Sequence, residues 1–235
     1  MDQWLELARG PIFQFAFLFM VLGLLRHLVL TIVNIGIAIW RASDRRIPLK
    51  AVAKATIEWL MPIGKLRGSV LFSITSFIMH IGLILVPVFL FSHIALWKRG
   101  LGIDFALPSM GLAAADLLTL VTIATIFAIL AMRIVGRDAR ELSRFEDYAI
   151  LVLLAVPFIS GYLALHPAIN PFAYSATMLV HVMGANLIMV LMPLTKLTHA
   201  VLMPTTQLVA ELGWHFPMKS GENVCIALHK EEEPV

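Results

Sequence analysis

The chain has 235 residues, of which 60% are hydrophobic and only 14% are charged, and its formal net charge is +3. So little polar surface cannot cover a soluble globule, and the composition therefore predicts an integral membrane protein. The single cysteine, Cys225, excludes an intramolecular disulfide framework. It also excludes an iron–sulfur cluster held by this chain alone, because such a cluster needs about four thiolates.

Five stretches reach the ~20 apolar residues that a membrane-spanning helix requires. They are residues 12–40, 70–97, 112–135, 148–166 and 173–203. The N-terminal sequence MDQWLELARG lacks the basic region of a cleaved signal peptide, so we expect the first span to stay in the mature protein. The predicted fold is all-α, an integral membrane bundle of five transmembrane helices.

Positively charged side chains gather in alternate linkers. The linker between the first two spans and the one between spans three and four carry eleven: Arg41, Arg45, Arg46, Lys50, Lys54, Lys65, Arg67, Arg133, Arg137, Arg140 and Arg144. The opposite side has only Arg9, Lys98 and Arg99. The positive-inside rule therefore predicts an N-terminus outside and a C-terminus in the cytoplasm, in the cell (inner) membrane. The net charge is explained by topology, with no need for nucleic acid.

Two further segments are expected outside the bundle. The apolar spacing of IPLKAVAKATIEWLMPIG, within the linker of residues 41–69, predicts a short helix lying on the inner membrane surface. The segment after Pro204 is too short to bury a core of its own and is expected to contact a cytoplasmic partner subunit. The chain thus divides into a membrane domain of residues 1–205 and a tail of residues 206–235.

His181 and His199 lie eighteen residues apart in the fifth predicted span. On a continuous α-helix this spacing is five turns, so both imidazoles would project from one face, roughly 27 Å apart. That separation nearly equals the thickness of the hydrocarbon layer, which places one histidine near each membrane surface. Two stacked b haems would need axial ligands at these two depths.

The second predicted span offers the partner histidines, His80 and His93. A haem iron with two histidine ligands takes neutral imidazoles from two facing helices. Spans two and five run in opposite directions, so the expected pairs are His80 with His199 for an inner haem and His93 with His181 for an outer one. Small residues beside these ligands would let a flat macrocycle approach the backbone: Gly82, Ser92, Gly184 and Ala185.

The spacing of His80 and His93 does not fit a straight helix. Thirteen residues correspond to about 220° of rotation and ~20 Å of rise, so the two imidazoles would not share a face. Pro87 lies between them and is expected to kink or unwind the helix. The alternative is that His27 of the first span replaces one of them. His27 otherwise packs between helices, or joins Arg26 at a haem propionate.

Asp116, near the start of the third span, is an acidic residue in apolar surroundings. With Lys98 and Arg99 it is expected near the outer haem, where a quinone headgroup would exchange electrons and protons. The competing interpretation is an aspartate that is favoured by the dipole at a helix N-terminus.

The remaining histidines have other expected roles. His166 is read as an outer loop residue, and His215 and His229 as solvated or interface residues of the tail.

With five spans and histidine pairs on spans two and five, residues 10–205 resemble the gamma subunit of respiratory nitrate reductase and its relatives. These relatives are di-haem cytochrome b subunits that react with quinone. The eighteen-residue spacing of His181 and His199 matches the family's fifth helix, whereas the spacing of His80 and His93 is wider than in nitrate reductase gamma.

A narrower resemblance is carried by HPAINPFAYSATMLVHVMGANLIMVLMPLTKLTHAVLMPTTQL and by the terminal ALHKEEEPV. Both are similar to the M subunit of the sulfite-reduction-associated transmembrane complex, and then to the cytochrome subunit of membrane heterodisulfide reductase. This resemblance implies electron transfer between menaquinone and a cytoplasmic iron–sulfur subunit of the heterodisulfide reductase type, within a complex that has other membrane or periplasmic subunits.

The leading hypothesis is therefore an electron-transfer subunit of a quinone-linked oxidoreductase complex, with two b haems and exchangeable menaquinone. One alternative is a haem-free anchor or assembly subunit, whose polar residues only hold helices together. Another is a proton or ion transporter that uses histidines and Asp116 as a relay, although Asp116 is the single acidic residue placed within a span.

Overall fold

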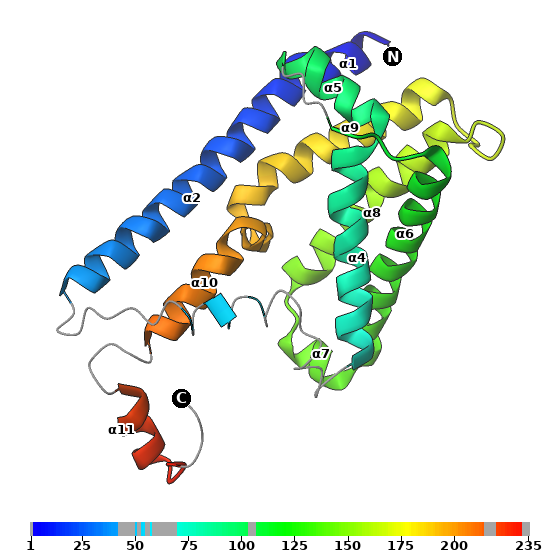
Figure 1. Cartoon of the computed structure of the whole chain (residues 1–235). Coiled ribbons are helices and arrows are strands. Elements are labelled where there is room, and N and C mark those ends of the chain that lie inside the picture. Colours follow the sequence, from blue (N-terminus) through cyan, green and yellow to red (C-terminus); the bar gives the residue numbers. More distant parts are fainter. Residues whose placement is uncertain are drawn as a thin grey trace. The chain divides into compact units, whose positions relative to one another are not determined.

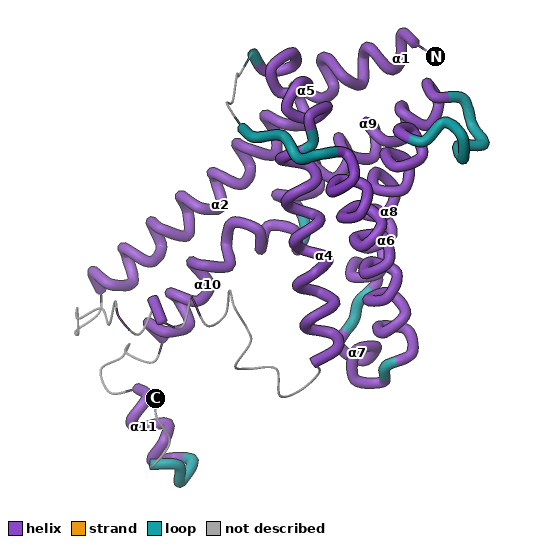
Figure 2. The backbone as a smooth tube through the Cα atoms, turned by 45° about the vertical axis from the view of Figure 1, so that its right-hand side comes forward, coloured by secondary structure: helices purple, strands orange, loops and turns teal. Residues whose placement is uncertain are grey.

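The computed structural model describes residues 2–41, 50, 53–54, 57, 70–102, 107–213 and 220–231. In these parts of the chain the structure is helical, without strands (Figures 1 and 2). Five helical segments are long and apolar enough to cross a membrane: Asp2–Arg41, Val70–Phe89, Leu112–Val135, Phe145–Leu165 and Tyr174–Leu194. The prediction of an all-α multi-pass membrane protein with five spans is confirmed. The direction of each crossing stays a prediction from charge.

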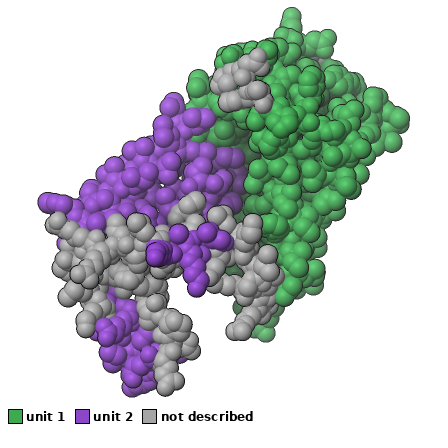
Figure 3. Space-filling model, in the orientation of Figure 1, with its two compact units in different colours: residues 1–20, 67–191 green, residues 21–66, 192–235 purple. Residues whose placement is uncertain are grey.

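The chain forms two compact units, coloured separately in Figure 3. The first unit contains residues 1–20 and 67–191, and the second contains residues 21–66 and 192–235. The predicted domain boundary at residue 205 falls inside helix α10 (His199–Gly213) and not between two helices. Helix α11 (Ser220–Ala227) follows in the second unit.

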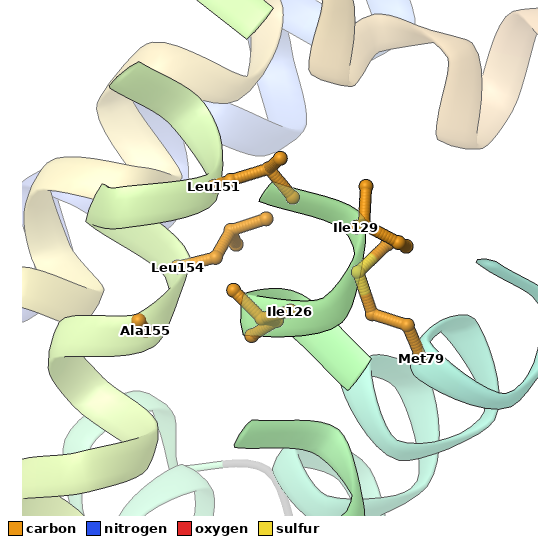
Figure 4. Close-up of a cluster of buried hydrophobic side chains, with 6 residues drawn as sticks. All are labelled: Met79, Ile126, Ile129, Leu151, Leu154 and Ala155. Atoms are coloured by element: carbon orange, nitrogen blue, oxygen red, sulfur yellow. The ribbon is translucent and has the colours of Figure 1, made fainter. Parts of the chain in front are cut away.

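Four long helices build the first unit: α4 (Val70–Phe89), α6 (Leu112–Val135), α8 (Phe145–Leu165) and α9 (Tyr174–Leu191). Helix α6 packs between α4 and α8, and α8 also packs against α9 (Figure 1). The centre of the unit is a buried cluster of apolar side chains, shown in Figure 4: Met79, Ile126, Ile129, Leu151, Leu154 and Ala155. Helix α7 (Arg137–Leu142) joins α6 to α8.

Helices α4 and α6 approach closely where Gly82 meets Thr122. A Cβ on Gly82 would overlap Thr122 Oγ1, so only glycine fits there. Thr122 is fully buried and donates a hydrogen bond to the Leu118 carbonyl at 2.6 Å. Small residues at such contacts are typical of membrane bundles, in which van der Waals packing, rather than the hydrophobic effect, holds helices together.

The second predicted span is broken near Pro87, as the sequence suggests. Helix α4 ends at Phe89, Leu90 is extended (φ −71°, ψ 129°), and helix α5 (Phe91–Leu101) begins after it. The αL conformation of Gly102 (φ 69°) then ends α5. His93 therefore belongs to a separate short helix, and the angle calculated for a straight helix does not apply to it.

The fifth predicted span is also broken, and here the prediction of one continuous helix is wrong. Helix α9 ends at Leu191 and is followed by two 3₁₀ turns, η3 (Met192–Leu194) and η4 (Lys196–Thr198). Between them Thr195 is extended (φ −127°, ψ −176°) and its hydroxyl accepts a hydrogen bond from the Leu197 amide. Since α10 starts only at His199, the five-turn relation between His181 and His199 does not hold.

The N-terminus contains a helical arm that the predicted first span omitted. Helix α1 (Asp2–Leu7) leads into a π-helical turn, η1 (Ala8–Ile12), and then into α2 (Phe13–Arg41). Leu5 and Ala8 of the arm pack against Val182 of α9. The arm is fixed further by Asn186, whose side-chain amide donates to the Ala8 carbonyl at 3.0 Å.

Two sequence predictions fall on parts of the chain that the structure does not describe. The expected surface helix within residues 41–69 lies almost entirely outside the described residues. His215 also lies outside them.

Candidate functional site

His93 and His181 lie together in the first unit, one on α5 and the other on α9. Their ring centroids are 5.9 Å apart and the ring planes differ by only 4°. Both side chains are partly buried. This is the pair that the sequence assigned to an outer haem, and the structure brings its two members close together with their ring planes nearly parallel.

Each of the two imidazoles is anchored through Nδ1 to a backbone carbonyl. His181 Nδ1 lies 2.7 Å from the Pro157 oxygen, and His93 Nδ1 lies 3.2 Å from the Val86 oxygen. Because a carbonyl can only accept, Nδ1 carries the hydrogen, and in a neutral imidazole Nε2 then keeps its lone pair. An Nδ1 bond of this kind fixes the tautomer and the orientation of metal-binding histidines.

The break at Leu90 makes the His93 anchor possible. Residues 86 and 93 would be separated by about 10.5 Å of rise on a straight helix, too far for a side chain to bond to that carbonyl. Because the chain is extended at Leu90, α5 starts in a new direction and its first turn returns the His93 ring to Val86. The irregular backbone after Pro87 thus positions the His93 side chain.

Gly161 of α8 makes room for the His181 ring. A Cβ at this position would lie 2.8 Å from both Cε1 and Nδ1 of His181. The ring therefore lies directly over the glycine, one turn beyond the Pro157 carbonyl to which it bonds. Gly184 brings α9 against Val156 and Pro157 of α8 and so sets the distance between the two helices.

The separation of the two rings matches that of two ligands on opposite sides of one metal. With metal–nitrogen bonds of about 2 Å, two such imidazoles would have ring centroids about 6 Å apart. The described residues include no group of three or more His, Cys, Asp or Glu able to hold a metal ion. A haem needs only two protein ligands, because the porphyrin supplies the in-plane nitrogens. The donor set at His93 and His181 therefore suits haem better than a bare metal ion.

The two inner histidines are placed in different units. His80 Nδ1 lies 2.7 Å from the Ser76 carbonyl, within α4 of the first unit. His199, at the start of α10 in the second unit, has Nδ1 2.7 Å from the Lys196 carbonyl and an exposed side chain. Both rings thus have the same kind of Nδ1 anchor as the outer pair. Their pairing with each other stays a prediction.

His27 contacts the break in the fifth span. Its Nε2 lies 2.9 Å from the Pro193 carbonyl, so Nε2 carries the hydrogen and donates it. One turn earlier on α2, Gly23 faces Pro193 so closely that a Cβ would lie 2.6 Å from the proline Cβ. This geometry corresponds to the packing role that the sequence allowed for His27. The adjacent Arg26 is exposed on α2.

Two of the small residues that were expected to admit a macrocycle have another role. Gly82 faces Thr122 of α6, and Gly184 faces α8. Both bring helices together, so the interpretation of these two glycines as space for a haem was wrong. The glycine that accommodates the His181 ring is Gly161, which the sequence prediction did not include although it follows another small residue, Ser160.

Asp116 faces His166, a histidine that the sequence assigned to a loop. Asp116 Oδ2 lies 3.4 Å from His166 Nε2, and His166 Nδ1 lies 2.8 Å from the Tyr162 carbonyl. The Tyr162 ring stacks on the imidazole, with centroids 4.1 Å apart. Asp116 is the fifth residue of α6 and has its partner on α8, so the helix-dipole interpretation does not account for its position. A spacing signal was present, because Tyr162 and His166 are one turn apart.

Lys98 and Arg99 occupy the last turn of α5, the helix that carries His93 in its first turn. Their position at a helix C-terminus is electrostatically favourable by itself. The α5 end is held to the start of α2 by the Gln14 side chain, which donates to the Gly100 carbonyl at 2.8 Å, and by contact between the Phe17 and Trp97 rings.

The fold and the anchored imidazoles define a class of protein, a multi-pass all-α membrane protein with a histidine pair built into its bundle. No protein-family model matches the chain, and no solved structure matches it. It is 32% identical over 177 residues to a protein of Nitratidesulfovibrio vulgaris strain Hildenborough, over 74% of this chain and 75% of the relative. The chain belongs to the same family as this bacterial protein, whose description, "Protein", states no activity.

Proposed function

We propose that this protein is a di-haem cytochrome b subunit of a respiratory complex. The observation that carries the proposal is the outer histidine pair: two parallel imidazoles at 5.9 Å, each anchored through Nδ1 and with Nε2 left for a metal. A structural pair of histidines needs neither parallel rings nor a glycine beneath one of them. Two neutral imidazoles that are fixed through Nδ1 and keep a lone pair on Nε2 are what bis-histidine haem ligation needs.

The chain's own residues would hold the haems at two depths. His93 and His181 are the proposed ligands of the outer haem, and His80 and His199 are those of the inner one. When bound, the haems supply one-electron redox chemistry, while the protein supplies ligation, orientation and an apolar environment. Arg26 is a proposed partner of a propionate of the inner haem.

The partners of the complex follow from the resemblance and from the composition. Menaquinone is the proposed exchangeable substrate, near Lys98, Arg99 and Asp116 at the outer side. Because the chain has a single cysteine, an iron–sulfur subunit of the heterodisulfide reductase type would receive or supply electrons in the cytoplasm. The charge asymmetry supports a location in the cytoplasmic membrane, with residues 206–235 toward that subunit.

Optical spectroscopy of the purified protein tests the proposal. We expect a reduced-minus-oxidised difference spectrum with a b-type α band and two haems per chain by pyridine haemochrome. The matched control is His229→Ala, which changes a histidine of the tail and should leave the spectrum unchanged. If the purified wild-type protein shows no such band after expression with sufficient haem, the proposed function is wrong.

A haem-free anchor is the second candidate, and one observation favours it. Six histidines already bond to a backbone carbonyl in the protein alone: His27, His80, His93, His166, His181 and His199. Such bonds satisfy one nitrogen of each ring and would suit helix packing. An anchor role predicts that His93→Ala and His181→Ala lower stability but leave cofactor content unchanged.

A further inference from the structure

The contact between Asp116 and His166 is arranged around a proton. The Tyr162 carbonyl can only accept, so His166 Nδ1 carries a hydrogen, and Nε2 is the atom that faces the carboxylate. Without a proton, Nε2 would set its lone pair against a carboxylate oxygen at 3.4 Å. The contact is favourable only when one of the two groups holds a proton. The geometry therefore leaves a place for one proton between Nε2 and the carboxylate oxygen.

The pair is open to its surroundings. The side chains of His166 and Asp116 are 31% and 34% exposed. On α6, Asp116 lies between Leu112 and Leu120 at four-residue spacing, so the three share a helix face. These leucines are 69% and 45% exposed, and in a membrane such an apolar face meets lipid. A lipid-soluble molecule could approach the carboxylate from this side without crossing the protein core.

The pair also lies near the proposed outer haem ligands. Gly161 of α8 faces the His181 ring, and His166 follows five residues later at the end of the same helix. Five residues correspond to about 7.5 Å of helical rise. Helix α8 thus contacts the His181 ring through Gly161 and is capped at its C-terminus by His166.

From this juxtaposition, and resting on the proposed function, we propose that Asp116 and His166 exchange the protons of a quinol at the outer side. Oxidation of a hydroquinone removes two electrons and two protons. The two electrons would pass to the two proposed haems when these are bound, reducing each from ferric to ferrous. Each O–H bond of the ring hydroxyls breaks as its proton passes to Asp116 or His166, and from there to water outside. Quinone reduction uses the same groups in reverse.

A further titratable group, Tyr162, faces the pair, and its ring stacks on His166. Its contact is with the ring face, whereas Asp116 meets the ring edge at Nε2. Asp116 Oδ2 and His166 Nε2 are thus the two atoms between which a proton can be shared.

The test compares Asp116→Asn and His166→Gln with Asp138→Asn, which removes an exposed acid of α7. In the full-length purified protein, the rate of haem reduction by menadiol is measured by stopped flow, beside reduction by dithionite. We expect the two variants to be about a hundredfold slower with menadiol and unchanged with dithionite, as for loss of a general base. The pH dependence of the menadiol rate should flatten. Asp116→Glu, which keeps the carboxylate, should recover most of the rate.

The outcomes separate this inference from the proposed function. A wild-type protein without a b-type band overturns the proposed function. Normal bands together with wild-type menadiol rates in Asp116→Asn and His166→Gln overturn the proton-exchange role alone. A readout without haem is the infrared difference spectrum of the carboxyl region on menadione addition, in which a band that shifts in wild type and is lost in Asp116→Asn is expected. Absence of that band contradicts quinone contact at Asp116.

Discussion

The outer and inner histidine pairs differ in how the fold holds them. His93 and His181 share one compact unit, and their rings meet at 5.9 Å with their planes nearly parallel. His80 and His199 have the same Nδ1 anchors, but they belong to separate units, and the chain between α9 and α10 is not a continuous helix. Helices packed within one unit therefore fix both members of the outer pair relative to each other. For His80 and His199, each ring is anchored within its own unit.

The largest change in haem content is expected from substitutions in the outer pair. His93→Ala and His181→Ala should each remove about half of the bound haem, because a bis-histidine haem needs both ligands. The double variant should lose no more than either single variant, since the two residues serve one site and their effects are not additive. Haem quantification by pyridine haemochrome measures this. Loss of all haem in the double variant alone would show that the two residues serve different haems.

Substitutions in the inner pair should remove the other half of the bound haem. We expect His80→Ala and His199→Ala each to remove the other haem and to leave the outer one in place. Spectra resolved by redox titration distinguish the two haems. If His80→Ala and His199→Ala affect different haems, the proposed pairing of His80 with His199 is wrong.

A smaller effect is expected from Gly161→Ala. The added Cβ would lie 2.8 Å from two atoms of the His181 ring, so the ring must shift from its anchor at the Pro157 carbonyl. Loss of such outer-shell support typically weakens metal binding by about 10–100-fold. The change is measured as the rate at which the outer haem is lost to an excess of a haem-binding apoprotein. The matched control is Gly36→Ala on α2, where a Cβ meets nothing within 4 Å. Equal haem retention in both variants would contradict the role assigned to Gly161.

The smallest effect is expected from His27→Ala. If His27 only bonds to the Pro193 carbonyl, its loss lowers the free energy of unfolding by about 1–2 kcal/mol and leaves haem content unchanged. Thermal unfolding in detergent, followed by circular dichroism, and haem quantification measure the two quantities. Loss of one haem in His27→Ala would instead make His27 a ligand and remove one of the span-two histidines from that role.

The sequence predicts the fold well because each long span depends on local composition. The expected spans of residues 112–135 and 148–166 appear as α6 (Leu112–Val135) and α8 (Phe145–Leu165). Apolar length decides whether a helix crosses the bilayer, and that length is readable directly. The N-terminal arm, α1 (Asp2–Leu7) and η1 (Ala8–Ile12), was missed because its contact with α9 is a tertiary contact, which no local pattern records.

The candidate site was predictable in its residue types and less so in its geometry. The relation of His181 to His199 rested on an uninterrupted helix, although Pro193 lies between them and lacks the amide hydrogen that a helix interior needs. On a straight helix His80 and His93 would not share a face, so the sequence left open whether His27 replaces one of them. The break at Leu90 changed its direction. Gly161 and the contact of Asp116 with His166 depend on helix packing, so spacing within a single span does not show them.

The 4° angle between the His93 and His181 rings has a magnetic consequence. Parallel imidazoles donate π density to a ferric iron along one common direction, which separates its two dπ orbitals in energy. Crossed rings would leave those orbitals nearly degenerate. The proposed outer haem should therefore give a rhombic low-spin electron paramagnetic resonance signal, rather than the single strongly anisotropic feature of perpendicular ligands.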